Sequence, residues 1–322
     1  MAVLLAIAIY VNLITGSIAM TPGDVFAALT GRNSDAVQSN IVTVIRVPRI
    51  AAGFILGGAL ALSGYMLQTF FDNPIVGPFV LGISSGAKLT VALALIVFMA
   101  RGNKPGSLFL VGAAFIGAMA AMMFVLLISV RVKSMGILVV CGIMIGYICS
   151  AITDLVVTFA DDANIVNLHN WSMGSLSGTS RTDIGIMASL VGICVAAAVF
   201  MIKPIGAYRL GEAYARSGGV NITLLRVLLI LTSSLLAATV TAFAGPISFV
   251  GIAVPHLCRS MTKTSSPVVM IPGCFMLGAL VTLSCDCLAR TIFAPTEVSI
   301  SSVTAVLLVP VVITVMLKRR RS

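Results

Sequence analysis

The chain has 322 residues, of which 59% are hydrophobic and 9% are charged, and its formal net charge is +10. A soluble domain of this length carries roughly a quarter charged residues, so the composition excludes an ordinary soluble enzyme or binding module. Nucleic-acid binding would require basic residues clustered on one soluble face. The apolar spans leave no such face, so no nucleic-acid partner is expected.

Ten apolar spans, each close to the ~20 residues that cross a bilayer as a helix, are expected. The first lacks the basic start and the A-x-A cleavage site of a signal peptide, so we interpret it as a membrane helix. The chain starts almost inside this helix, so a short cytoplasmic leader is expected to be missing from this sequence. Residues 1–322 then form one transmembrane domain surrounded by lipid. The spans lie near 3–20, 50–68, 79–100, 108–130, 135–158, 184–202, 222–244, 247–262, 268–289 and 298–317.

The second span is unusually rich in small residues, and the breaker pair Asn73-Pro74 follows it. Small residues let helix backbones approach closely inside lipid, where no hydrophobic force draws helices together. We therefore expect this span to pack against protein, as in the body of a transporter or channel. The small residues are Gly53, Gly57, Gly58, Ala59, Ala61, Ser63 and Gly64.

Basic residues of the short loops set the expected orientation. Lys318 and the three arginines after it place the C-terminus in the cytoplasm, and counting back ten spans places the N-terminus there too. Twelve basic residues then lie in inner segments and seven in outer ones, which is the expected direction. The outer residues are Arg32, Arg46, Arg49, Arg101, Lys104, Arg181 and Arg290.

Two of the outer arginines, Arg46 and Arg49, stand at the start of the second span. They could anchor the helix end at lipid headgroups, because long basic side chains reach the interface readily. They could equally form a docking patch for an acidic partner outside the membrane. The physics of the sequence leaves both interpretations open.

Motifs for catalysis, cofactors and metals are missing from the sequence. There is no phosphate-binding G-x-x-x-x-G-K-[ST] loop, and the seven cysteines and two histidines show no metal-ligand spacing. We expect no catalytic residues, no cofactor and no metal site. Lys88, Asp154 and Asp286 are the ionisable candidates within the spans, and an ion-coupled carrier usually needs more.

One inner segment, near 203–221, is long and carries both signs of charge. Its pattern would suit two short helices joined by a glycine turn, and we expect it to contact a soluble cytoplasmic partner. A simple connector would be shorter and less patterned. The residues of this expected coupling loop are Leu210, Gly211, Glu212, Ala215, Arg216 and Gly219.

From about residue 20 to the end, the chain resembles the FecCD family of permease subunits, which serve ABC importers of iron-siderophores, haem and vitamin B12. Four motifs in order carry the resemblance. They are Arg46-x-Pro48-Arg49 with its small-residue span; Leu210-Gly211-Glu212 with Ala215-Arg216 and Gly219; Gly245-x-Ile247-x-Phe249-Val250-Gly251 with Pro255-His256-x-x-Arg259; and Asp286-x-x-Ala289-Arg290 with Glu297 and Thr304-Ala305.

The resemblance implies a type II ABC importer permease in the cytoplasmic membrane of a prokaryote. It implies a second permease subunit, identical or paralogous, and a cytoplasmic ATPase that binds the coupling loop. It also implies an extracytoplasmic binding protein that docks on Arg46, Arg49 and Arg290, which favours docking over lipid anchoring. An inner gate is expected near Ser134 and Met135. A ferric siderophore is the first expectation for the substrate, with haem or vitamin B12 as alternatives.

Large substrates favour a pathway lined by small and weakly polar groups. The fifth span offers Gly142, Gly146 and Ser150, and the tenth offers Ser301 and Ser302. Ordinary small-residue packing would explain the same residues equally well. Two other classes remain as alternatives: an ion-coupled secondary transporter, and a membrane scaffold, which would leave the arginines and the 203–221 loop without a role.

Overall fold

The computed structural model describes residues 1–16, 18, 20–31, 35–99, 106–132, 134–294 and 296–319. The basic residues Arg32, Arg101, Lys104, Lys133, Arg320 and Arg321, which were used for the orientation, lie outside this part of the chain. Within it every regular element is helical, which confirms the expected all-α fold. The elements are α1 (Ala2–Ile14), α2 (Pro22–Leu29), α3 (Ala36–Asn40), η1 (Ile41–Arg46), α4 (Val47–Phe71), η2 (Pro78–Leu81), α5 (Ile83–Met99), α6 (Ser107–Arg131), α7 (Met135–Thr158), α8 (Asp162–Ser172), α9 (Arg181–Phe200), α10 (Ile202–Tyr208), α11 (Glu212–Ser217), α12 (Ile222–Ala244), α13 (Val250–Thr262), α14 (Pro267–Thr291) and α15 (Ile300–Arg319).

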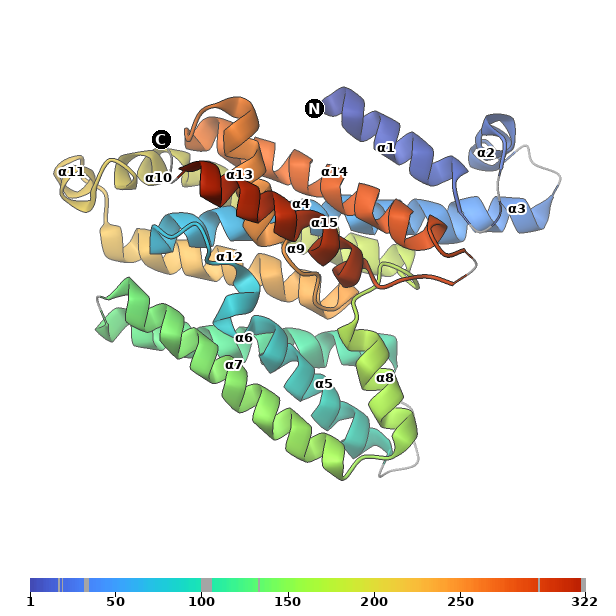
Figure 1. Cartoon of the computed structure of the whole chain (residues 1–322), viewed down its shortest axis with the longest axis horizontal. Helices are drawn as coiled ribbons and strands as arrows, with labels where there is room; N and C mark the ends of the chain where they lie inside the picture. The colour runs from blue at the N-terminus through green and yellow to red at the C-terminus, as the bar shows by residue number, and fades with distance from the viewer. Residues whose placement is uncertain are drawn as a thin grey trace.

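Most of the long helices run roughly along the horizontal axis of Figure 1, so the molecule has two ends. The short helices α10 and α11 lie at one end, near the C-terminus, and α2 and α3 lie at the other (Figure 1). α5, α6, α7 and α8 form a group below the rest, and α12 contacts both α5 and α6 of this group and the central helix α4.

Each of the ten expected spans contains a helix. The bounds of α7 and α12 coincide with the expected ranges 135–158 and 222–244. Six helical stretches of the described chain are long and apolar enough to cross a membrane. They end where the sequence changes character: after α4, for example, Asp72 adopts a left-handed conformation and the Asn73 side chain accepts a hydrogen bond from the backbone of Ile75.

The eighth span is shorter than expected. α13 begins at Val250 rather than near 247, and its 13 residues make about 20 Å of helix, against a hydrocarbon core of about 30 Å. Gly245 and Phe249 ahead of it have positive φ angles of 69° and 64°, which helical backbone does not allow. The irregular backbone of 245–249 is buried or half-buried in protein, as irregular backbone at membrane depth must be.

α4 forms the centre of the helix packing, with α14, α12, α13 and α9 around it. A Cβ atom on Gly57 would come within 2.7 Å of the Gly278 carbonyl oxygen on α14, and one on Gly64 would overlap the Gly251 carbonyl on α13. The small residues of the second span therefore permit close approach of two other helices. This confirms that the span packs against protein.

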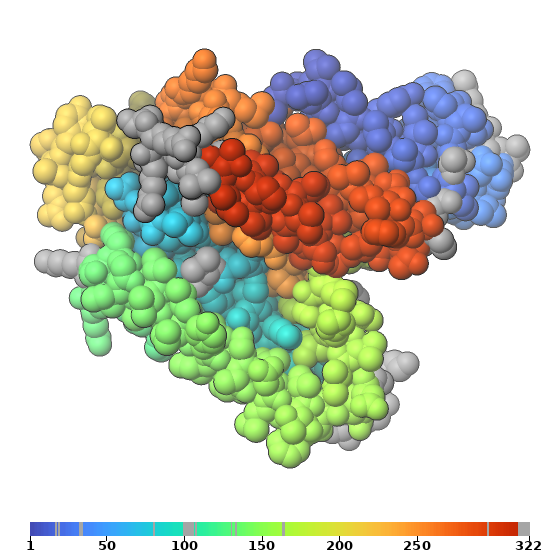
Figure 2. Space-filling view, in the orientation of Figure 1, coloured from blue at the N-terminus to red at the C-terminus, as the bar shows by residue number. Residues whose placement is uncertain are grey.

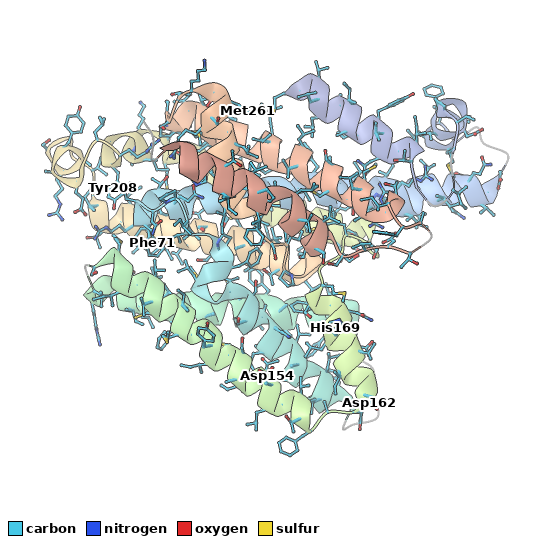
Figure 3. All side chains as sticks on the ribbon, in the orientation of Figure 1. Phe71, Asp154, Asp162, His169, Tyr208 and Met261 are labelled. Atoms are coloured by element: carbon cyan, nitrogen blue, oxygen red, sulfur yellow. The ribbon has the colours of Figure 1, made fainter. Side chains whose placement is uncertain are left out.

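α7 lies on the outside of the group formed by α5 to α8, and only 17% of its most apolar window is buried. In the space-filling view α7 and α8 form the lower edge of the molecule (Figure 2). Many exposed side chains of α7 are large and apolar, among them Val140, Met144, Tyr147 and Ile148. Asp154 is also exposed on this helix (Figure 3), so this acid is not enclosed in the interior of the chain.

Candidate functional site

The two ends of α4 carry the two polar regions of interest. Arg49 lies in its first turn, and Gln68 and Thr69 lie in its last. Twenty residues of helix separate Arg49 from Thr69, which corresponds to about 30 Å. One region therefore lies at the end that holds α2 and α3, and the other at the end that holds α10 and α11 (Figure 1).

The first region is a cluster of three arginines and two acids, centred on Arg49. Its Nε atom donates to both carboxylate oxygens of Asp286 at 3.1 Å, and its Nη2 donates to Oδ1 of Asp286 at 3.0 Å. Its Nη1 donates to the two oxygens of Glu297 at 2.9 and 3.1 Å. Arg49 thus joins α4 to α14 and to the segment between α14 and α15.

Arg290 and Arg46 tie the first helix of the chain to this cluster. The Nε atom of Arg290 lies 3.3 Å from Oδ2 of Asp286, and its Nη2 donates to the side-chain oxygen of Asn12 on α1 at 2.5 Å. The Arg46 guanidinium donates to the carbonyls of Leu13, Ile14 and Ile18, and so holds the connection between α1 and α2. Both arginines therefore stabilise the position of α1 and of the residues that follow it.

Burial distinguishes the members of the cluster. Arg46, Arg49 and Arg290 are 4%, 7% and 7% exposed, and Asp286 is 2% exposed. The Glu297 side chain, in contrast, is 47% exposed. Three guanidinium groups against two carboxylates leave a formal charge of +1. Charges buried to this degree need partners. The two acids supply them for Arg49 and Arg290, and three backbone carbonyls supply them for Arg46.

The three arginines expected to dock a partner are therefore gathered in one place, but their side chains point into the protein and not outward. Sequence reasoning treated Asp286 as an isolated acid within a span and missed that two of the arginines neutralise it. The signal was available, because Asp286, Arg290 and Glu297 belong to one motif. The docking role of the arginines stays a prediction.

The second region is the segment 203–221, and it has the shape that its sequence predicts. Two short helices, α10 and α11, are joined at Gly211, whose φ of 123° favours glycine. Glu212 forms an ion pair with Arg226 of α12 at 2.7 Å, and the Arg209 guanidinium donates to the Ser265 carbonyl between α13 and α14. The loop is thus fixed to α12 and to the turn between α13 and α14.

The surface of this loop is mixed. Ala215 is fully buried, whereas Leu210 and Tyr214 are 71% and 59% exposed. Arg216 and Gly219 are exposed as well, and Gly219 has a positive φ of 81° at the end of the loop. Leu210 and Tyr214 thus expose large side chains on a loop that is otherwise polar and is held in place by its neighbours. Such a surface suits contact with another protein.

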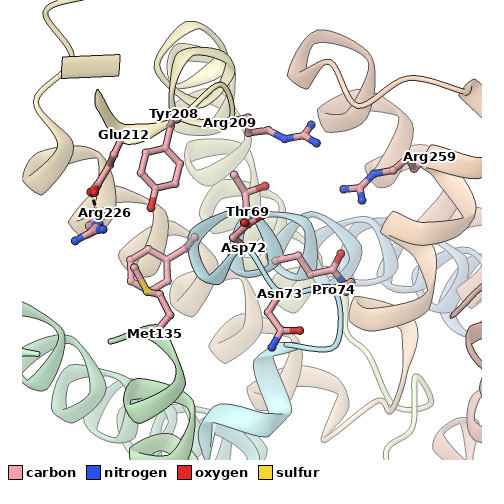
Figure 4. A pocket seen from close by; sticks show the side chains of 13 residues that line it. Thr69, Asp72, Asn73, Pro74, Met135, Tyr208, Arg209, Glu212, Arg226 and Arg259 are labelled. Carbon is pink, nitrogen blue, oxygen red and sulfur yellow. Dashed lines mark ion pairs between the residues drawn. The ribbon is translucent and has the colours of Figure 1, made fainter. Parts of the chain in front are cut away.

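A cavity of about 430 Å3 lies beneath this loop. Gly211, Glu212 and Met135, the first residue of α7, are among the residues that line it. Figure 4 shows Glu212 and Met135 on different sides of the cavity. The expected gate and the expected coupling loop therefore meet at one cavity, although 76 positions separate Met135 from Gly211. Ser134, the N-cap of α7, makes no side-chain capping bond. Other side chains around the cavity include Thr69, Asp72, Asn73, Tyr208, Arg209, Arg226 and Arg259 (Figure 4).

The residues expected along the pathway contact neighbouring parts of the chain. Gly142 and Gly146 on α7 lie against the backbone around Gly82, and the hydroxyl of Ser150 lies 3.3 Å from that of Ser85. On α15 the Ser301 hydroxyl donates to the Pro246 carbonyl, and the Ser302 hydroxyl lies 2.8 Å from that of Ser299. Their role in a pathway stays a prediction.

Comparison with known proteins gives a consistent result. The model of the FecCD transport family matches residues 4–318. The vitamin B12 import system permease proteins BtuC of Citrobacter koseri and Salmonella typhi are each 32% identical over 322 residues, which is all of this chain and 94% of theirs.

Two solved structures are also similar. An ABC transporter described as metal-chelate type, in an inward-facing conformation, aligns with a TM-score of 0.86 and 26% identity over 98% of this chain and 97% of that one. PsaBC from Streptococcus pneumoniae, in complex with Fab, aligns with a TM-score of 0.56 and 15% identity over 91% and 95% of the two chains, and so shares the fold alone.

Proposed function

This chain belongs to the FecCD transport family of ABC importer permeases, and from that premise we propose that it moves a ferric siderophore across the cytoplasmic membrane. It is a multi-pass membrane protein and a transport subunit, not an enzyme. As a permease of this type it works with an ATPase and a binding protein. In the proposed orientation both termini, α10 and α11 face the cytoplasm, and the arginine cluster faces outward.

The observation that carries the role as an importer permease is the separation of the two polar regions to opposite ends of α4. An importer driven by ATP needs one contact for its ATPase on the inner side and one for its binding protein on the outer side. The tethered loop with exposed Leu210 and Tyr214 suits the first. The cluster with a formal charge of +1 suits an acidic partner, because complementary charge speeds association.

The attachments of the loop support a role in coupling. Glu212 forms an ion pair with Arg226 of α12, and Arg209 donates a hydrogen bond to the turn between α13 and α14. A displacement of α10 and α11 by the ATPase would therefore move the adjoining ends of α12, α13 and α14 as well. Met135 lines the same cavity, so the movement would reshape the entrance to α7.

A second permease subunit would cover the exposed apolar face of α7. The pathway would then lie between the two subunits, next to Ser150 on α7 and Ser302 on α15. In a pair of identical subunits each α7 would be covered by the other copy. In a pair of paralogues α7 would be covered by the related subunit. The oligomeric state of the purified complete transporter, measured by light scattering, distinguishes a permease pair from a single permease.

A second candidate substrate is vitamin B12, because the relatives named above are permeases of vitamin B12 import systems. The two substrates, and haem as a third, can be separated by uptake of labelled compounds into cells that lack this chain. Loss of ferric siderophore uptake, restored by the wild-type chain, supports the proposal. Loss of cobalamin uptake alone would replace it with the second candidate.

A further inference from the structure

Arg49 is held by two acids of different character. Asp286 lies near the end of α14 and is 2% exposed, whereas the Glu297 side chain is 47% exposed. Glu297 belongs to the irregular segment between α14 and α15, so its side chain can turn away without unwinding a helix. The Arg49 side chain itself is 8% exposed, and Glu297 accepts two hydrogen bonds from its Nη1 atom.

We propose that Glu297 is an internal substitute for the binding protein, and that a carboxylate of the binding protein replaces it on Arg49 when the two proteins dock. This inference rests on the proposed function, because it assumes that a binding protein docks at this end. It adds that the docking site is occupied from within until the partner arrives. Docking is then an exchange of one ion pair for another.

The structure singles out Arg49 for this exchange. Arg46 is bound to three backbone carbonyls, and their loss would release the connection between α1 and α2. Arg290 is bound to Asp286 on its own helix α14 and to Asn12 on α1, and both of these partners are buried. Both of these arginines position the site, and Arg49 alone among the three has a half-exposed acid as partner.

Space for the incoming group lies beside the pair. A cavity of about 230 Å3 is lined by Arg49, Asp286 and Glu297 together with Ser177 and Ser299. A carboxylate on a short side chain fits in this volume and would meet the same Nη1 atom that Glu297 now occupies. The two serines lie in the segments that precede α9 and α15.

The proposal can be tested with Glu297→Gln, which removes the internal competitor but keeps the size of the side chain. The matched control is Asp161→Asn, which removes one negative charge from an exposed residue on the same side of the membrane in the proposed topology. Asp161 makes no side-chain capping bond, so the control changes charge and little else. The probe is the binding protein that supports uptake by the wild-type chain, with the permease in nanodiscs.

We expect Glu297→Gln to bind this protein about two- to fivefold more tightly than the wild type, the range that a partly exposed ion pair supports. Most of the gain should appear in the association rate at low salt, since the charge of the cluster rises by one. The gain in affinity of Asp161→Asn should be less than half of the gain of Glu297→Gln. Glu297→Asp keeps the charge, reaches Arg49 less well, and should fall between the wild type and Glu297→Gln.

Equal affinities for Glu297→Gln and Asp161→Asn, or weaker binding by Glu297→Gln, would overturn the exchange while leaving docking itself intact. If Glu297→Gln does not fold, Glu297→Asp decides the question, and affinity equal to or below wild type counts against the exchange. A wild-type chain that binds no binding protein, although it folds and assembles with an ATPase, would overturn the proposed function and this inference together.

Discussion

Arg49 and Asp286, 237 positions apart in the chain, are joined by three hydrogen bonds of 3.0 to 3.1 Å in the interior of the helix bundle. The pair fastens α4 to α14 at the same end at which Arg290 and Asn12 fasten α14 to α1. A buried ion pair of this kind contributes little net stability, but removing one partner leaves an unpaired buried charge. The cluster is therefore sensitive to the loss of a single acid.

Asp286→Asn should destabilise the protein by about 3 kcal/mol, because Arg49 and Arg290 both lose their buried acid. The measurement is thermal unfolding of the detergent-purified chain. Asp154→Asn is the control: Asp154 is exposed on α7 and should change stability little and leave most transport intact. Equal melting temperatures for the two variants would contradict the role given to Asp286.

Reversal of Arg49 to Glu should abolish most docking of the binding protein, since the side chain that would receive its carboxylate becomes an acid. Binding of the loaded binding protein to nanodiscs is measured at low and at physiological salt, and the wild-type interaction should weaken as salt rises. Assembly with the ATPase should persist. Arg46→Glu should also weaken docking. Both reversals should lower stability, Arg49→Glu because Asp286 and Glu297 lose their cation and Arg46→Glu because three carbonyls lose their donor, so each variant is compared with the wild type by thermal unfolding as well.

Gly211→Ala should reduce transport for each ATP hydrolysed, because φ of 123° is strained for any residue with a Cβ atom. Open space surrounds a Cβ atom here, so the effect arises from the backbone and not from a clash. Gly206→Ala on α10 is the control, since it also meets open space and lies in ordinary helix. Normal uptake with normal ATPase activity in Gly211→Ala would argue against a coupling role.

Glu212→Lys tests the same loop through its ion pair. The new lysine would face Arg226 at a position where the two side chains are now 2.7 Å apart, so α11 should detach from α12. We expect ATP hydrolysis to continue in the assembled transporter while uptake falls. Coupled uptake at the wild-type level would show that the loop transmits force without this contact.

Gly64→Ala should destabilise the bundle by about 2 kcal/mol or more, since its Cβ atom would overlap the Gly251 backbone, which cannot move aside as a side chain could. Gly185→Ala on α9 is the matched control, because nothing lies near its added methyl group. That control should be neutral or slightly stabilising, as alanine favours helix over glycine. Thermal unfolding distinguishes the two, and equal effects would contradict the close contact of α4 with α13.

Much of the local structure follows from the sequence. The expected spans at 135–158 and 222–244 are the observed helices α7 and α12, and the pair of short helices on either side of Gly211 was expected from the same pattern. The reason is physical. Within lipid each helix must satisfy its backbone hydrogen bonds within itself, so apolar length and breaker residues decide where it begins and ends.

The tertiary structure alone decided how distant residues meet. Arg49 was expected to point outward, and it is covered by Asp286 and Glu297. Met135 and Gly211 were expected at the same side of the membrane, and they line one cavity. Burial, ion pairing and cavities depend on which helices lie side by side. Hydropathy predicts the bounds of each helix separately and carries little information on which helices are neighbours. Close contacts such as that of Gly57 with Gly278 determine which faces of α4 and α14 pack together.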